Sequence, residues 1–101
     1  MKLPIKKLDI LAHRYRVKVS PELSGDEMGR CDVHQCLILI APDLTPDQMK
    51  DTLLHEIRHA VNWLVGLDDR STEEEHTARG TTGLRATLAA EPELAAWIFS
   101  R

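Results

Sequence analysis

Aromatic residues are scarce in this chain of 101 residues, since Phe, Trp and Tyr together make up only 4% of it. With so few rings, we expect no platform that stacks successive bases of a single-stranded nucleic acid. Positive charge is also limited, because 13 Lys and Arg residues stand against 16 Asp and Glu residues and give a net charge of -3. Nucleic-acid binders usually present a basic face, so we expect no nucleic acid as a partner.

Long apolar runs are missing as well. The apolar stretch after the positively charged start is interrupted by Asp9 and is too short for a secretory signal. No run approaches the ~20 apolar residues that span a bilayer, so we expect a cytoplasmic protein with no membrane partner. Cys31 and Cys36 are the only cysteines. We interpret them as reduced, small apolar residues on neighbouring strands, because no second pair completes a zinc cage; a redox pair or half of a metal site is the alternative.

The length and composition fit one soluble globular domain over residues 1–101. A chain of this size is large enough for a single core and too small for two. Its hydrophobic fraction of 43% and charged fraction of 29% are ordinary for such a domain. We therefore look for one site.

The first 40 residues predict a small, mostly antiparallel sheet. Tyr15, Val17 and Val19 alternate with charged residues, as expected for a strand with one buried face. The turn residues and the apolar runs then predict a strand around Leu8 and Ile10, a loop over residues 20–29, and two strands over 30–33 and 36–40. Because the last of these is apolar on both faces, it should lie centrally or under a helix.

After Pro42 the apolar period becomes helical. Thr45, Pro46 and Gln48 form a strong helix start, with an N-cap, a proline in the first turn and a capping box. Apolar residues then recur at helical spacing and Gly66 supplies the stop, where the periodic residues are Leu53, Ile57, Ala60, Val61 and Leu64. A second helix should run from Ser71-Thr72 to about Ala90, and a short one over 93–99. The fold class is therefore α+β.

The segment His55-Glu56-Ile57-Arg58-His59 is an HExxH motif in the middle of the first predicted helix. Residues four apart on a helix project from one face, so both imidazoles can reach one ion at the ~2.0–2.1 Å of zinc to nitrogen bonds. Glu56 can then act as the general base on a water whose pKa the zinc lowers toward about 7. A surface helix with two exposed histidines is the bland alternative. The apolar stripe lies on the other side of the helix from the two histidines, which favours the metal-binding interpretation.

A catalytic zinc usually has three protein ligands, and the motif supplies only two of them. The identity of the third ligand is undecided at this point. The candidates in the following segment are Asp68, Asp69, Glu73, Glu74, Glu75 and His76. Counting back along the inner face of the second helix from Leu84 brings Glu74 to that face, whereas Glu75 turns aside. Glu75 can instead close a capping box with Thr72. We therefore predict Glu74 as the third ligand, with Glu75 and His76 as alternatives.

Other residues give weaker signals. Gly80 and Gly83 lie inside a predicted helix, which indicates either close approach to the HExxH helix or local fraying. Arg58 should point to solvent or to an acid of the second helix, and Trp63 should lie in the core, with a wall of the site as the alternative. Tyr15 and His76 are the possible oxyanion donors.

The segment 52–60, TLLHEIRHA, resembles the motif of small phage-type metallopeptidases related to the ImmA/IrrE group. The acidic run 73–75, Gly83-Leu84 and the tail over 88–97 also look like that family, and the alternating N-terminal strands look like its head. The resemblance therefore covers nearly the whole chain. It implies a compact zincin-like fold in which a glutamate from the following helix completes the zinc site. His55 and His59 match the paired ligands, Glu56 the general base, and Glu74 best matches the downstream glutamate.

The resemblance has one departure. Residues 76–80, HTARG, stand where the family tends to have a more apolar, carboxylate-containing stretch. The SprT-like zincins, which use a third histidine, are a second comparison, in which His76 would take that role. Members of the first group cleave regulatory proteins such as repressors, which implies a regulatory protein or peptide as substrate. The sequence thus predicts a zinc-dependent peptidase; the alternatives are a zinc-containing binding module without turnover and a DNA-associated protease.

Overall fold

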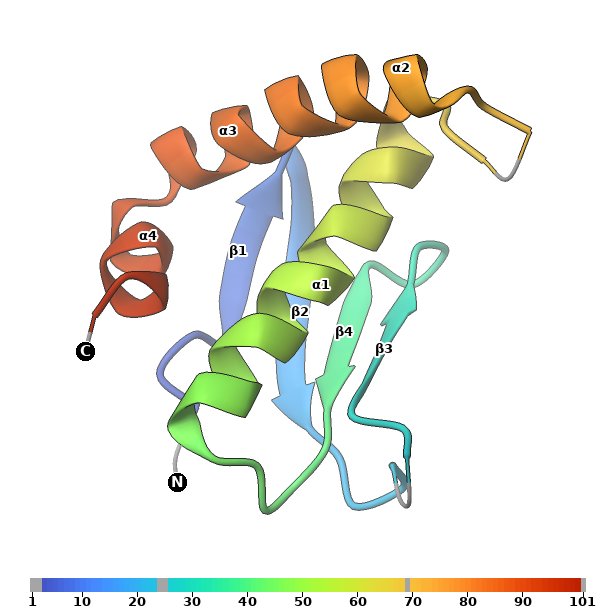
Figure 1. The fold of residues 1–101 in the computed structure, drawn as a ribbon. Helices are drawn as coiled ribbons and strands as arrows, with labels where there is room; N and C mark the ends of the chain where they lie inside the picture. The colour runs from blue at the N-terminus through green and yellow to red at the C-terminus, as the bar shows by residue number, and fades with distance from the viewer. Residues whose placement is uncertain (1–2, 24–25, 69, 101) are drawn as a thin grey trace.

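Helices cover one face of a four-stranded sheet in the computed structural model, which describes residues 3–23, 26–68 and 70–100, with only the backbone of Glu73 (Figure 1). The chain is α+β, as predicted. The strands are β1 (Lys7–Ile10), β2 (His13–Val19), β3 (Gly29–Asp32) and β4 (Leu37–Ile40). The helices are α1 (Pro46–Leu64), α2 (Glu73–Glu75), the π-helix η1 (His76–Gly80), α3 (Thr81–Ala90) and α4 (Pro92–Ile98). Within the described residues, none of the helices has the length and apolar character needed to cross a membrane.

The sheet has the strand order β1-β2-β4-β3. The pairs β1·β2 and β3·β4 are antiparallel, as predicted, while β2 and β4 pair in parallel, with Val17 opposite Ile38. β4 therefore lies between two neighbours, which explains why its sequence is apolar on both faces. The same order leaves β3 at an edge of the sheet.

The core lies between the sheet and α1. Alternate residues of the strands point toward the helix, and the apolar stripe of the helix packs against them. The side chains of this stripe, Leu53, Ile57, Ala60 and Val61, are all 0% exposed, and so are Ile10, Tyr15, Ile38 and Ile40 of the sheet. This burial fixes the rotation of α1 about its axis, so the opposite side of the helix carries the motif histidines.

Both ends of α1 are made as the sequence predicts. The Thr45 hydroxyl accepts from the Gln48 backbone N–H at 3.2 Å, and the Gln48 side chain accepts from the Thr45 N–H at 2.9 Å, which completes the capping box. Gly66, with φ of +77°, follows the helix in the left-handed conformation that glycine favours.

The second predicted helix is a composite of three parts. α2 is followed by five residues in π-helical form before α3 continues to Ala90. A π-helix bonds residue i to i+5 and accommodates an extra residue in the turn. Gly80 and Gly83 lie where this composite helix approaches α1 closely, which confirms the first of the two interpretations of these glycines. A Cβ on Gly83 would lie 2.5 Å from Cγ1 of Val61.

Candidate active site

His55 and His59 lie one turn apart on the exposed side of α1. Their Nε2 atoms are 3.0 Å apart, and their ring centroids are 4.6 Å apart at an interplanar angle of 82°. Two zinc to nitrogen bonds of ~2.0–2.1 Å at a tetrahedral angle would place the nitrogens about 3.3 Å apart. The imidazole pair therefore fits a shared metal ion with only a small adjustment.

Glu56 lies beside the pair but faces inward, and only 6% of it is exposed. Burial raises the pKa of its carboxyl group, the imidazoles of His59 and His55 act in the opposite direction, and the carboxylate of Glu27 raises it further. A carboxyl group with a raised pKa is a better proton acceptor when ionised, which suits a general base.

The inward position of Glu56 depends on a glycine of the edge strand. A Cβ on Gly29 would lie 2.9 Å from Oε2 of Glu56 and 2.6 Å from Cγ2 of Thr52. No side chain fits there without displacing one of these groups. The prediction that Gly29 ends a loop is wrong, because it begins β3. Sequence spacing gave no sign that this glycine packs against the motif glutamate.

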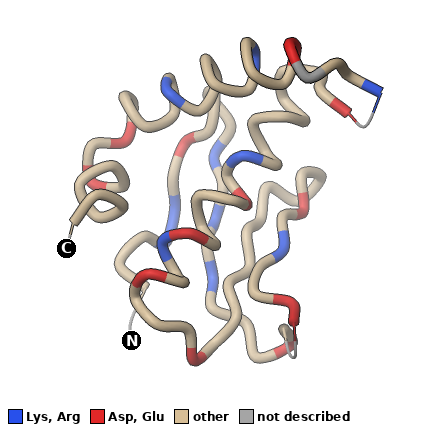
Figure 2. Tube along the Cα trace, viewed as in Figure 1, with Lys and Arg blue, Asp and Glu red and all other residues tan. Residues whose placement is uncertain are grey.

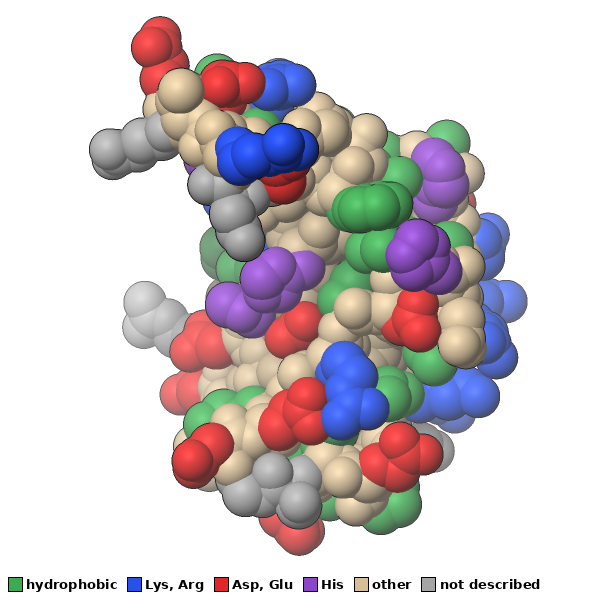
Figure 3. All heavy atoms as spheres, turned by 90° about the vertical axis from the view of Figure 1, so that its right-hand side faces the viewer, with side chains coloured by type: hydrophobic (Ala, Val, Ile, Leu, Met, Phe, Trp, Pro, Cys, Tyr) green, Lys and Arg blue, Asp and Glu red, His purple; other side chains and the backbone are tan. Residues whose placement is uncertain are grey.

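Two adjoining hollows meet at this point. One, of about 510 Å³, lies toward the start of α1 and the other, of about 700 Å³, lies toward its end. Gly29, His55 and Glu56 line both. The acids Asp26, Glu27 and Asp51 add to the lining of the first, whereas the second continues past His59 to Trp63, Asp68 and His76. Figure 3 shows histidine side chains (purple) beside acidic ones (red) along this hollowed face. The motif thus lies where the two hollows of one open cleft adjoin.

The third ligand is not gathered with the histidine pair. Among the residues that the structure describes, no three His, Cys, Asp or Glu side chains are close enough to hold a metal ion. Glu74 is exposed and does not line the cleft, whereas Asp68 and His76 do. Asp69 and the side chain of Glu73 lie outside the described residues.

The placement of Glu74 on the inner face fails because of η1. Counting back from Leu84 at 3.6 residues per turn crosses the five π-helical residues, which hold more residues per turn and so rotate everything before them. This rotation leaves Glu74 in solvent and directs His76 toward the cleft. The role of Glu74 as a ligand stays a prediction.

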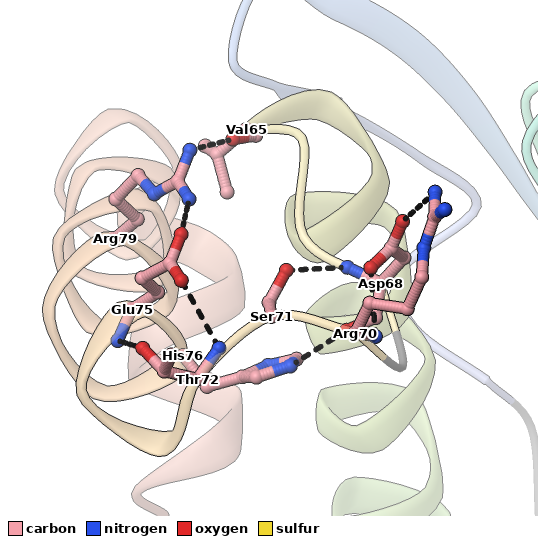
Figure 4. Close-up of polar contacts among 8 residues, drawn as sticks. All are labelled: Val65, Asp68, Arg70, Ser71, Thr72, Glu75, His76 and Arg79. Carbon is pink, nitrogen blue, oxygen red and sulfur yellow. Dashed lines mark hydrogen bonds and ion pairs between the residues drawn. The ribbon is translucent and has the colours of Figure 1, made fainter.

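Figure 4 shows how the segment before η1 is tied together. Glu75 closes the capping box with Thr72 through two hydrogen bonds of 3.1 Å, as its alternative role predicted, and it also pairs with Arg79. These hydrogen bonds, first from the Thr72 backbone, lower the pKa of the Glu75 carboxyl group. His76 donates from Nε2 to the carbonyl of Asp68 at 3.1 Å. The carboxylate of Glu75 is thus occupied by the capping box. The Nδ1 atom of His76 takes no part in the hydrogen bond to Asp68.

Arg58 has neither of its predicted positions. It is half-buried, and its Nη2 donates to the backbone carbonyl of His76 at 3.1 Å while Nε donates to Oδ1 of Asn62 at 3.3 Å. The guanidinium group lies over Gly80, where a Cβ would be 2.6 Å from Nη2. The prediction of a solvent or acid contact is therefore wrong, and Arg58 joins α1 to the π-helix.

Trp63 lies outside the core, whereas Tyr15 lies inside it, on the buried face of its strand as the alternation predicts. Trp63 is 55% exposed, lines the cleft and meets His34 edge to face at 5.5 Å, so its predicted core position is wrong. Tyr15 is fully buried in the core and does not line the cleft, which removes it as an oxyanion donor. Cys31 also lines the cleft, although burial raises the pKa of its thiol to about 12.

Comparison of the chain with protein-family models, with curated protein sequences and with solved structures gave no match.

Proposed function

We propose that this chain is a zinc-dependent peptidase that hydrolyses peptide bonds of a cytoplasmic protein, in the manner of the phage-type metallopeptidases that its sequence resembles. The observation that carries the proposal is the arrangement on α1. Two imidazole Nε2 atoms lie 3.0 Å apart, and a buried carboxylate with a raised pKa lies beside them. An exposed pair of histidines with no function has no need of a buried acid at their side.

The residues present divide the work of hydrolysis. His55 and His59 would hold the ion, which when bound acidifies a water molecule and polarises the peptide carbonyl. Glu56 would take a proton from the attacking water and deliver it to the leaving amine. His76 lines the same cleft and is the remaining candidate for an oxyanion donor.

The shape of the cleft supports a peptide as substrate. β3 lies at the edge of the sheet, and its first residue, Gly29, touches Glu56. An extended peptide that adds to an exposed sheet edge is held by backbone hydrogen bonds regardless of its sequence. A peptide on β3 would pass directly beside the proposed general base.

For the third ligand we keep Glu74 from the family resemblance, with His76 as the alternative that lines the cleft. Zinc affinities of Glu74→Gln and His76→Gln separate the two. Loss of a ligand should weaken zinc binding by a factor of 10 or more, because even outer-shell changes cost about 10- to 100-fold. If a variant retains the wild-type affinity for zinc, the residue that it replaces is not the third ligand.

Replacement of Glu56 tests the function. Glu56→Gln should bind zinc with the stoichiometry of the wild type and cleave no peptide in a mixed peptide library, because the amide cannot accept the proton. Glu93→Gln is the matched control, since Glu93 is exposed on α4 and outside the cleft. Cleavage by Glu56→Gln at the wild-type rate would show that the assigned base is wrong.

The second candidate is a binding module that retains zinc and has no turnover. It is favoured by one observation, that no third ligand is gathered with the histidine pair among the described residues. Stoichiometric zinc in the purified protein without cleavage of any peptide in the library favours the module. Measured turnover excludes it.

A further inference from the structure

The face of the sheet turned away from α1 is basic. Alternation along β1 and β2 sends Leu8, Tyr15 and Val17 into the core, so their neighbours project from the opposite face. These neighbours include Lys7, Arg14, Arg16 and Lys18, all exposed, which we call the basic face. In Figure 2 the blue segments of β1 and β2 lie behind α1, and in Figure 3 blue side chains follow one side of the molecule.

The overall charge of -3 hides this face because most acids lie elsewhere, and Asp9 is the one acid that β1 and β2 carry among these cations. The acids Asp26, Glu27 and Asp51 gather at the cleft, on the other side of the sheet. An average over the whole sequence therefore gave no indication of a basic surface. The alternation of apolar and charged residues along β1 and β2 places the apolar side chains in the core and the cations on the opposite face.

The cations of the basic face are largely without counterions. Arg14 pairs with Asp9 at 2.7 Å, but in the described part of the chain no carboxylate lies within ion-pair distance of Lys7, Arg16 or Lys18. Lys7 is the antiparallel partner of Arg16, so two like charges stand directly opposite each other. Such a pair destabilises a sheet. A bound polyanion would reverse that cost.

The spacing of the charges fits a linear polyanion. Arg14, Arg16 and Lys18 follow one strand at intervals of about 6.8 Å, since each residue of a strand advances about 3.4 Å. The only Phe, Tyr or Trp in the four strands as described is Tyr15, which is buried. Because single-stranded nucleic acids are bound largely by stacking bases on aromatic rings, this face favours the phosphate backbone of a duplex.

We propose that the basic face binds the backbone of duplex DNA without reading its sequence. The cleft lies on the opposite side of the sheet, so a chain on DNA would keep its cleft free for a protein substrate. Three unpaired cations would release about three counterions, which predicts a slope of roughly -2.7 for log K against log salt concentration. Affinity should therefore fall roughly 40-fold between 0.05 and 0.2 M salt.

The test is the binding of a fluorescent 20-base-pair duplex to the full chain, followed by anisotropy at several salt concentrations. The triple variant Lys7→Gln, Arg16→Gln, Lys18→Gln should lose at least 10-fold in affinity at low salt and most of the salt dependence. A matched control, Lys50→Gln, Arg70→Gln, Arg85→Gln, removes the same charge from the helical side and should bind as the wild type does. Amide chemical shifts of the labelled wild type should change on β1 and β2 when DNA is added.

Three outcomes would overturn the proposal. One is the absence of binding to the duplex at low salt. Another is a triple variant that binds as tightly as its control, with both variants folded by circular dichroism. The third is binding of a poly-glutamate chain as tight as that of DNA, which would assign the face to an acidic protein. Each readout is independent of peptide cleavage.

Discussion

The Nη2 atom of Arg58 donates to the backbone carbonyl of His76 at 3.1 Å, which joins the middle of the HExxH motif to the first residue of the π-helix. Arg58 thus adds a side-chain hydrogen bond from α1 to a backbone carbonyl of the π-helix. A residue that lies between His55 and His59 thus also ties α1 to the segment that follows it.

Two glycines that contact α1 should respond differently to alanine. Gly83→Ala places a Cβ 2.5 Å from Cγ1 of the fully buried Val61, a stiff side chain with no space to move into. Overpacking costs about 1–3 kcal/mol, more than the ~1 kcal/mol that alanine gains in a helix. Gly80→Ala meets only the guanidinium of Arg58, so it can disturb the hydrogen bonds of that group to Asn62 and His76 but does not overpack the core, and it should cost less than Gly83→Ala. Urea unfolding at pH 7 compares the two; equal stabilities would contradict the prediction.

Gly29→Ala should reduce peptide cleavage more than it reduces stability. The new Cβ must displace the carboxylate of Glu56, and a misplacement of about 1 Å at a catalytic group costs on the order of 100-fold in rate. Thr52→Ser removes the other atom that the Cβ would meet, Cγ2 of Thr52. The double variant should therefore regain stability in urea unfolding without regaining kcat. Full recovery of kcat in the double variant would show that Glu56 is not the group disturbed.

Zinc should stabilise the folded chain. A ligand that binds only the native state at 100 times its Kd adds about 2.7 kcal/mol, which raises the melting temperature of a domain of this size by roughly 10–20 °C. Calorimetry with excess zinc and then with a chelator measures this shift. His55→Ala and His59→Ala should abolish it, while His13→Ala, an exposed histidine of β2, should leave it unchanged. A shift that survives both motif substitutions would place the metal elsewhere.

Tyr15→Phe should stabilise the chain, increasingly so at high pH. The Tyr15 hydroxyl is buried without a hydrogen-bond partner among the described residues, so its removal should gain up to about 1 kcal/mol at pH 7. Burial raises the pKa of Tyr15 to about 12 from 10.0, so the folded state keeps the proton that the unfolded state loses. Ionisation of Tyr15 in the unfolded state therefore has no effect on wild-type stability well below pH 10 and lowers that stability progressively between about pH 10 and 12.

Urea unfolding of both proteins from pH 7 to 11 checks this sign. The difference between the two unfolding free energies at each pH removes the contributions that both proteins share. The advantage of the Phe variant should grow by roughly 1.4 kcal/mol per pH unit above 10. An advantage that stays constant with pH would show that the phenol ionises equally in both states.

Much of the fold follows from local patterns. The capping box at Thr45, the stop at Gly66 and the apolar stripe of α1 each depend on near neighbours in the chain, and the structure shows all three. The same stripe placed His55 and His59 on the exposed side. Helical phase was sufficient there because α1 is regular over its whole length.

Other features depend on contacts between distant segments. The parallel pairing of β2 with β4, and the packing of Gly29 against Glu56, join residues that no sequence period relates. The π-helix shows a different limit, since HTARG contains no residue that demands the wide turn. Its form is supported by Arg58 from another helix, so the phase of Glu74 could not be counted from sequence.

The edge position of β3 also bears on self-association. An unpaired strand edge is a template for a second chain, and joining two copies there would close the approach to Glu56. β3 is only four residues long, and Arg30 at its second position is held by Glu27 through contacts of 2.6 and 3.0 Å. Short length and a fixed charge are the usual protections against such growth. The edge beside Glu56 therefore carries two features that disfavour pairing with a second copy of the chain.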